Sequence, residues 1–278
     1  MNYLYFQTGQ TPKYLEYSIK SVLKSDPDAN IYLASDQAYN LDNVQTVSTA
    51  NIESERIKEI INLKYFQSWN NNPLWESSLL RIFYLYELAN YLKCNSFVHF
   101  DSDVLLYKSF TDISENMINN KLNITPLTKD FLVFGYSYID NLSIYDDICE
   151  SVLKIYKNPK YYEENYYEGK KIIEMKALYI AYHQNPEWFN LLPIHPKDAK
   201  NFIFDPASYG QYIGGVDKKM FSKKFIDGKH LVSSDLRTKV IKPKITKNIP
   251  SVGYEDKNFD LVNLHVHSKK LKNYFPKG

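Results

Sequence analysis

The chain has 278 residues, of which 44% are hydrophobic, 15% aromatic and 24% charged; these ordinary globular proportions exclude a largely disordered chain. Its formal net charge is only +2, and three of its 34 basic residues are arginine. Because binding to nucleic acid favours strongly basic surfaces and bidentate arginine contacts, nucleic acid is excluded as an expected partner.

The cysteine content and the hydropathy of the chain indicate the compartment. Cys94 and Cys149 are too few for a disulfide framework and fit no zinc-binding spacing, which favours a reducing environment. No apolar stretch reaches about 18 residues, so we expect no transmembrane segment. Residues 1–10 lack the basic and apolar regions of a signal peptide. These features predict a cytoplasmic protein and leave its oligomeric state open.

The first third of the chain alternates between apolar runs and a helical pattern. Short apolar runs predict strands at 3–6, 30–34 and 44–47. Apolar residues at helical spacing between 15 and 23 predict a helix between the first two strands. This strand–helix–strand order is typical of a parallel sheet covered by helices.

The rest of the chain begins regularly and then becomes irregular. A helix from Pro73 to Leu92 and a buried strand at 96–100 are predicted first. Further on, we expect helices at 144–155 and 172–182, a tyrosine-rich loop at 158–171, a tight turn at 201–217, a basic linker at 239–250 and an extended segment at 261–270. The pattern predicts one Rossmann-like α/β domain over 1–278, with a central, mainly parallel sheet flanked by helices and an irregular C-terminal half.

The buried strand at 96–100 leads directly into Asp101-Ser102-Asp103. Strand periodicity places residues i and i+2 on the same side, about 6–7 Å apart at Cα, so the two carboxylates repel each other unless a cation or a proton intervenes. The carboxyl ends of strands are where open α/β sheets bind ligands, and a divalent ion held there can bridge the phosphates of a nucleotide. The alternative is a solvated turn without function.

A second signal is His265-Val266-His267, which lies near the C-terminus. In an extended segment both imidazoles point the same way. An imidazole added to two carboxylates suits Mn²⁺ better than Mg²⁺, and Lys269 follows closely enough to neutralise a metal-bound diphosphate. The alternative is a surface strand with two histidines.

A third signal is the segment 204–215, which contains Gly210, Gly214 and Gly215. Its glycines allow the backbone to approach a ligand closely. Asp205 lies at the start of the segment and Asp217 just after it, and a carboxylate there can take a proton from a reacting hydroxyl. The alternative is a structural turn in which Asp205 caps the backbone.

The sequence resembles the GT-A class of metal-dependent, nucleotide-sugar glycosyltransferases. The resemblance rests on the strand 97–104 with its D-x-D motif, on the upstream helix that carries Arg81, and on the late segment 264–269. It implies a GT-A-like fold and the transfer of a sugar from a nucleotide-diphosphate sugar to a hydroxyl of a glycan or small-molecule acceptor, with a UDP-sugar as the first expectation for the donor. The cofactor that it implies is Mn²⁺, or Mg²⁺ in its place.

The resemblance also implies roles for individual residues. It places 1–110 in a nucleotide-sugar-binding half and 111–278 in an acceptor-binding half with a C-terminal metal- and diphosphate-binding segment. The implied donor-binding residues are Phe6, Gln7, Thr8 and Asp36 at the base and ribose, Arg81 and Lys269 at the diphosphate, and Asp101 at the ribose or the metal. The implied metal ligands are Asp101, Asp103 and one or both of His265 and His267. The acceptor side would include Asp205, Asp217 and Gln211. The chain lacks the acidic pair and the C-terminal motif of better-known subfamilies, so inversion and retention both stay open.

Two other functions fit parts of the pattern. A phosphatase of the haloacid-dehalogenase type also places D-x-D after a strand, but its motif normally opens the domain and precedes a threonine. Here the motif begins at residue 101 and precedes Val104 and Leu105. A non-catalytic nucleotide- or carbohydrate-binding module on the same fold would retain the pocket without turnover.

Overall fold

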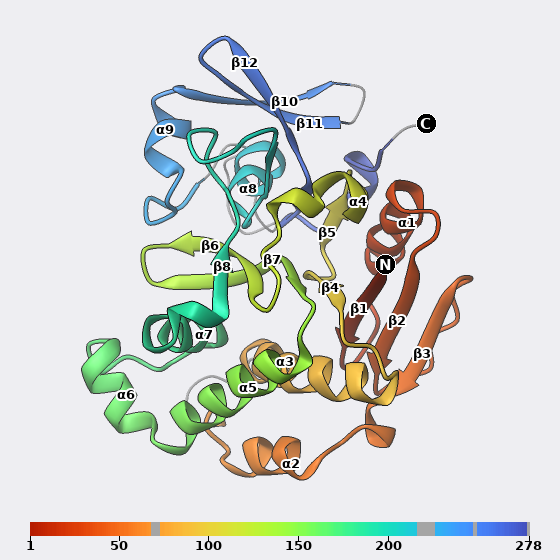
Figure 1. Cartoon of the computed structure of the whole chain (residues 1–278), viewed down its shortest axis with the longest axis vertical. Helices are drawn as coiled ribbons and strands as arrows, with labels where there is room; N and C mark the ends of the chain where they lie inside the picture. The colour runs from red at the N-terminus through yellow and green to blue at the C-terminus, as the bar shows by residue number, and fades with distance from the viewer. Residues whose placement is uncertain (68–72, 216–225, 247–248, 277–278) are drawn as a thin grey trace.

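The computed structural model describes residues 1–67, 73–215, 226–246 and 249–276. Its centre is a seven-stranded sheet in the order β3-β2-β1-β4-β7-β6-β8 (Figure 1). The strands are β1 (Asn2–Gln7), β2 (Asn30–Ser35), β3 (Val44–Ser48), β4 (Phe97–His99), β6 (Leu122–Thr128), β7 (Phe131–Ile139) and β8 (Phe189–Leu191). Neighbours pair in parallel except where β7 meets β4 and β6. The expected α/β fold with a mainly parallel sheet is therefore confirmed.

Helices cover both faces of this sheet. The helices of the described residues are α1 (Leu15–Ser25), α2 (Glu55–Asn62), α3 (Pro73–Tyr91), α4 (Phe110–Ile113), α5 (Leu142–Lys157), α6 (Pro159–Tyr166), α7 (Glu174–Gln184), α8 (Ser208–Gly214) and α9 (Ser233–Arg237). Alternation along β1 explains the two layers, because successive strand residues point to opposite faces. Leu4 and Phe6 join a core with α3, α5 and α7, whereas Tyr3 and Tyr5 join a core with α1.

The C-terminal part adds two small sheets. One has the order β10-β11-β12-β9, and the other pairs β13 with β5. Their strands are β5 (Val104–Leu106), β9 (Phe202–Ile203), β10 (Ile241–Thr246), β11 (Ile249–Tyr254), β12 (Lys257–Leu261) and β13 (Asn263–His265). Figure 1 shows β10, β11 and β12 at one end of the molecule, above α8 and far from α2. Short 3₁₀ turns complete the described part of the fold: η1 (Thr49–Asn51), η2 (Ser114–Asn116), η3 (Pro186–Trp188) and η4 (Leu271–Asn273).

Three expectations for the second half were wrong. The predicted linker at 239–250 forms β10 and the start of β11; Ile241 is buried and Lys242 exposed, and Pro243 is tolerated because β10 is an edge strand. The predicted loop at 158–171 contains α6, in which Tyr162 and Tyr166 pack their apolar rings on the core. The predicted turn at 201–217 contains β9 and α8 in its described part.

No helix within the described residues is both long enough and apolar enough to cross a membrane.

Candidate functional site

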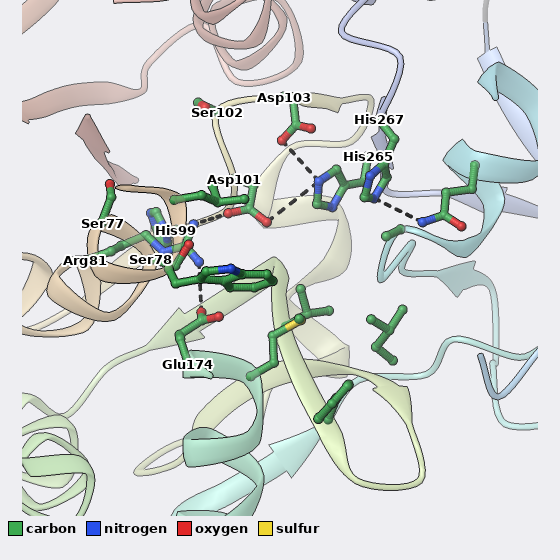
Figure 2. A pocket seen from close by; sticks show the side chains of 18 of the residues that line it. Ser77, Ser78, Arg81, His99, Asp101, Ser102, Asp103, Glu174, His265 and His267 are labelled. Atoms are coloured by element: carbon green, nitrogen blue, oxygen red, sulfur yellow. Dashed lines mark hydrogen bonds and ion pairs between the residues drawn. The ribbon is translucent and has the colours of Figure 1, made fainter. Parts of the chain in front are cut away.

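A cavity of about 560 Å³ opens at the carboxyl ends of β1 and β4, where an α/β sheet is expected to bind ligands. Polar side chains of α3, of α7, of the segment after β4 and of the chain after β12 form part of its lining, and Figure 2 shows those that it labels converging. The residues that line it are Phe6, Gln7, Tyr14, Leu74, Trp75, Ser77, Ser78, Arg81, His99, Asp101, Ser102, Asp103, Leu127, Thr128, Phe131, Val133, Glu174, Met175, Ala207, Gln211, Asp227, Lys229, His230, His265, His267 and Lys269.

Asp101 and Asp103 both face this cavity, but a turn rather than strand alternation brings them together. Strand β4 ends at His99, and the backbone N–H of Val104 donates to the Asp101 carbonyl at 3.1 Å, which closes a four-residue turn. The turn is anchored to β7, because the Asp101 N–H donates to the Phe134 carbonyl at 2.9 Å. The expectation of an extended D-x-D was therefore wrong, although both carboxylates reach the predicted place.

His265 joins the two carboxylates through the pairing of β13 with β5. In this antiparallel pair His265 lies opposite Val104, directly after Asp103. The His265 Nε2 is 3.1 Å from Asp103 Oδ1 and 3.7 Å from Asp101 Oδ2, and dashed lines mark both approaches in Figure 2. One ligand atom from each of the three residues lies within 4.8 Å of the others. Two carboxylates and one imidazole are a donor set that fits a divalent cation such as Mn²⁺.

Neighbouring basic side chains balance the negative charge of the Asp103 carboxylate. Burial raises the pKa of the Asp103 carboxyl, but His265 and Lys269 outweigh it and hold this pKa well below its usual range. Lys269 forms an ion pair with Asp103 through an Nζ that also lies 5.4 Å from the centre of the Tyr14 ring. Burial lowers the pKa of His265, and the Asp103 charge more than reverses the effect, so the pKa of His265 is raised. The Asp103 carboxyl is thus ionised, which is the form that can hold a cation.

Arg81 lies where a helix residue was expected to face the cavity, and its guanidinium pairs with two carboxylates. It forms ion pairs with Asp101 and, at 2.8 Å, with Glu174, and its guanidinium lies 4.9 Å from the centre of the Phe134 ring. Figure 2 shows Arg81 between the two carboxylates. Its position is consistent with a diphosphate contact, but the structure itself shows it as the partner of Asp101 and Glu174.

Glu174 is a site residue that the sequence reading missed. It opens α7 and is only 4% exposed, and burial raises the pKa of its carboxyl to about 7, against the opposing effect of Arg81. A signal existed in the sequence: Glu174 follows Ile172 and Ile173 at the start of the predicted helix. A carboxylate beside such an apolar run is buried only when it is paired.

The two late histidines lie side by side but differ in their partners. Their rings stack with centroids 4.5 Å apart and an interplanar angle of 17°. The His267 Nε2 lies 3.5 Å from the side-chain amide nitrogen of Gln211. Burial, with the neighbouring His265, lowers the pKa of His267 to about 3. Of the two, His265 is therefore the histidine that reaches the D-x-D carboxylates, and Gln211 lines the cavity beside His267.

Asp205 does not face the cavity. Its side chain is fully buried, and its two oxygens accept four backbone N–H groups, from Ala207, Tyr209, Gly210 and His265. The structure thus contradicts its expected role as the proton acceptor at the acceptor hydroxyl, because its lone pairs are already used. The capping alternative is the one that the structure supports. Asp217 lies outside the described residues, so its expected role stays a prediction.

The residues expected at the nucleotide base divide into two groups. Phe6 and Gln7 line the cavity, and the Phe6 ring stacks on Tyr84 with centroids 5.0 Å apart. Thr8 and Asp36 do not line it. The Thr8 hydroxyl lies 3.1 Å from that of Ser77, and the exposed Asp36 accepts the Gly9 N–H at 2.9 and 3.0 Å. Both therefore shape the loop after β1, and direct contact between either residue and a nucleotide stays a prediction.

Comparison with known proteins gives distant structural likenesses. No family model matches the sequence, and no curated protein sequence matches it. Among solved structures, mouse xyloside xylosyltransferase 1 is 11% identical, with 69% of this chain and 86% of that chain covered and a TM-score of 0.49. An active-site mutant of LgtC is 16% identical, with 68% and 70% covered and a TM-score of 0.43. The PaToxG glycosyltransferase is 14% identical, with 66% and 69% covered and a TM-score of 0.42. The chain is thus similar to glycosyltransferases of known structure, and at this distance the similarity does not decide its activity.

Proposed function

We propose that the protein is a metal-dependent glycosyltransferase that moves a sugar from a nucleotide-diphosphate sugar to a hydroxyl of a glycan or small-molecule acceptor. The observation that carries the proposal is the meeting of Asp101, Asp103 and His265 in one cavity with the cationic Lys269. A donor set of this kind, next to a lysine, suits a cation that binds a diphosphate. We further propose a UDP-sugar as the donor and Mn²⁺, or Mg²⁺ in its place, as the ion.

In this proposal the chain's own residues prepare the leaving group. When bound, the divalent ion supplies positive charge that stabilises the departing diphosphate. Lys269 is placed to add a second positive charge, because its Nζ already lies at Asp103 and its side chain is 42% exposed. Arg81 forms ion pairs with both Asp101 and Glu174, and its pair with Asp101 fixes that carboxylate after the C-terminal end of β4.

The two halves of the chain contribute different walls to the cavity. Residues 1–110 supply Phe6, Gln7 and the D-x-D turn, and we propose this half as the donor side. Residues 111–278 supply an apolar wall that includes Leu127 and Val133, together with Gln211, and we propose this half as the acceptor side. His265 and Lys269 belong to the second half of the chain but lie on the proposed donor side of the cavity.

A thermal-shift screen tests the proposal with UDP, GDP and their sugars, each with and without Mn²⁺. Ligands that bind the folded state raise Tm by mass action. We expect UDP or a UDP-sugar to raise Tm with Mn²⁺ and EDTA to abolish the effect. Asp103→Asn should remove the Mn²⁺-dependent shift, while Asp28→Asn, a change at an exposed aspartate, should retain it.

Two results would overturn the proposal. One is a response to phosphate analogues with Mg²⁺ but to no nucleotide, which would favour a phosphatase. The other is an Asp103→Asn protein that responds to Mn²⁺ and nucleotide as the wild type does. Nucleotide binding without any turnover would point instead to a binding module.

A further inference from the structure

The carboxylate of Asp205 joins helix α8 to strand β13. Oδ1 accepts the backbone N–H groups of Ala207 and Tyr209, both at 2.9 Å. Oδ2 accepts those of Gly210 at 2.9 Å and His265 at 3.0 Å. Burial raises the pKa of this carboxyl and the N–H groups act against it, but no oxygen is left to exchange a proton with a substrate. Three of these donors belong to the start of α8 and the fourth to the backbone of His265, so one side chain holds both.

Asn263 completes the junction. Its Oδ1 accepts the Asp205 N–H at 3.0 Å, and its Nδ2 donates to the Asp205 carbonyl at 2.8 Å and to the Gly135 carbonyl at 2.9 Å. Like Asp205, Asn263 is fully buried. The pair therefore ties β7, the segment before α8 and β13 together without a contact to solvent. A buried network in which every hydrogen bond is made is rigid, and it is costly to disturb.

Two glycines allow the elements to approach this closely. A Cβ on Gly210 would lie 1.9 Å from the His265 carbonyl oxygen, and a Cβ on Gly135 would lie 2.5 Å from that of Asp205. Any side chain at these positions would push against backbone, which cannot rotate away. The distance between α8 and His265 is thus set by direct backbone contact as well as by the Asp205 carboxylate.

His265 is consequently fixed from two sides. On one side β13 pairs with β5, which sets His265 opposite Val104, and the Val266 N–H donates to the Asp103 carbonyl at 2.9 Å. On the other side the Asp205 carboxylate holds the His265 N–H. Both restraints act on the backbone from which the imidazole extends to 3.1 Å from Asp103.

We infer that Asp205 and Asn263 are positioning residues that set the metal affinity of the site by fixing the backbone of His265. The inference rests on the metal site of the proposed function. Neither residue lines the cavity, and the proposed metal ligand that their network holds is His265. Partners that orient a metal ligand typically contribute about 10–100-fold in affinity. The role differs from a purely structural one, in which a change would lower stability and leave metal binding intact.

The test is a calorimetric titration of Mn²⁺ into the full chain and into Asp205→Asn. Asparagine keeps the shape of the side chain but turns an NH₂ group toward backbone N–H donors, so the hold on His265 weakens. We expect the Kd for Mn²⁺ to rise at least about tenfold in a protein that still melts cooperatively. We expect the same rise in Kd for Asn263→Ser. This variant replaces Asp205→Asn in the test if Asp205→Asn does not fold.

A matched control comes from a second buried asparagine. Asn123 is also fully buried and bonds the Ile118 N–H at 2.8 Å, the Asn190 side chain at 2.8 Å and the Tyr138 carbonyl at 3.3 Å, but it does not line the cavity. Asn123→Ser should lower Tm about as much as Asn263→Ser and leave the Kd for Mn²⁺ unchanged.

The outcomes distinguish a failure of the positioning role from a failure of the proposed metal site. If wild type binds Mn²⁺ and both junction variants lower Tm while binding Mn²⁺ as tightly as wild type, the positioning role is refuted and the metal site stands. If the wild-type chain takes up no Mn²⁺, the proposed function loses its metal site and the inference falls with it. A rise in Kd in the junction variants, with no rise in Asn123→Ser, supports the inference.

Discussion

The N-terminal sheet and the C-terminal segment reach the site in different ways. Strands β1 to β4 pair in parallel with near neighbours, and the D-x-D turn simply follows the last of them. His265 and Lys269 arrive only because β13 crosses back to β5, and the Lys269–Asp103 pair spans 166 positions in sequence. The first region is organised by local periodicity, and the second by one long-range strand pair. The group of Asp101, Asp103 and His265 therefore forms only where the two regions are joined.

We expect substitutions at the junction between α8 and β13 to have the largest effect on stability. Gly210→Ala places a Cβ within 1.9 Å of the His265 carbonyl, so we expect it to lower the free energy of unfolding by about 3 kcal/mol, because backbone must shift. Gly214→Ala is the control on the same helix, since its nearest neighbour is a Tyr274 side-chain atom at 3.4 Å. Urea unfolding of both variants measures the difference, and equal stabilities would contradict the tight junction.

Variants of the two late histidines test which part of the C-terminal segment belongs to the site. His265→Ala removes the imidazole that lies 3.1 Å from Asp103, and we expect the Kd for Mn²⁺ to rise about 100-fold. His267→Ala removes only the stacked neighbour, and we expect less than about a tenfold change. Calorimetry with Mn²⁺ measures both. A larger loss in His267→Ala would exchange the two assignments.

Glu174 offers a pH test in the part of the site that the sequence reading missed. Its folded-state pKa is raised from 4.5 to about 7 by burial, so its contribution to stability is fully present below about pH 4.5 and is lost as the pH rises through about 7. Glu174→Gln stays neutral throughout. We expect the stability of wild type relative to Glu174→Gln to fall by about 3 kcal/mol between pH 4.5 and pH 8. Urea unfolding at several pH values would show a constant difference if Glu174 titrated normally.

Lys269 should show two effects of opposite sign. Its ammonium pairs with Asp103 and thus competes with a metal ion for the same carboxylate, so Lys269→Met should tighten Mn²⁺ binding several-fold in the absence of nucleotide. The same change should weaken UDP binding in the presence of Mn²⁺ by about tenfold, because one positive charge is lost. Lys270→Met, at an exposed neighbour, controls for net charge. Weaker Mn²⁺ binding in Lys269→Met would contradict the competition.

The sequence was informative where structure is local. The strands β1, β2, β3 and β4 and the helix α3 follow from periodicity, and the D-x-D motif follows from its place after β4. The strand β10 was missed because Pro243 and its lysines read as a linker, although Ile241 and Ile245 alternate with them. No local sequence pattern predicts that Asp205 accepts four N–H groups, because one of its donors, His265, is 60 positions away. Glu174 was missed for a related reason, since its partner Arg81 lies on another helix.

The most direct test of the central claim is the release of UDP from a panel of UDP-sugars by the wild-type chain. We predict Mn²⁺-dependent release from at least one of them, abolished by EDTA and reduced on the order of 100-fold or more in Asp103→Asn, whose lost carboxylate is a proposed metal ligand. Release that is the same in wild type and Asp103→Asn would contradict the account. So would an absence of UDP release together with the hydrolysis of phosphate monoesters in Mg²⁺.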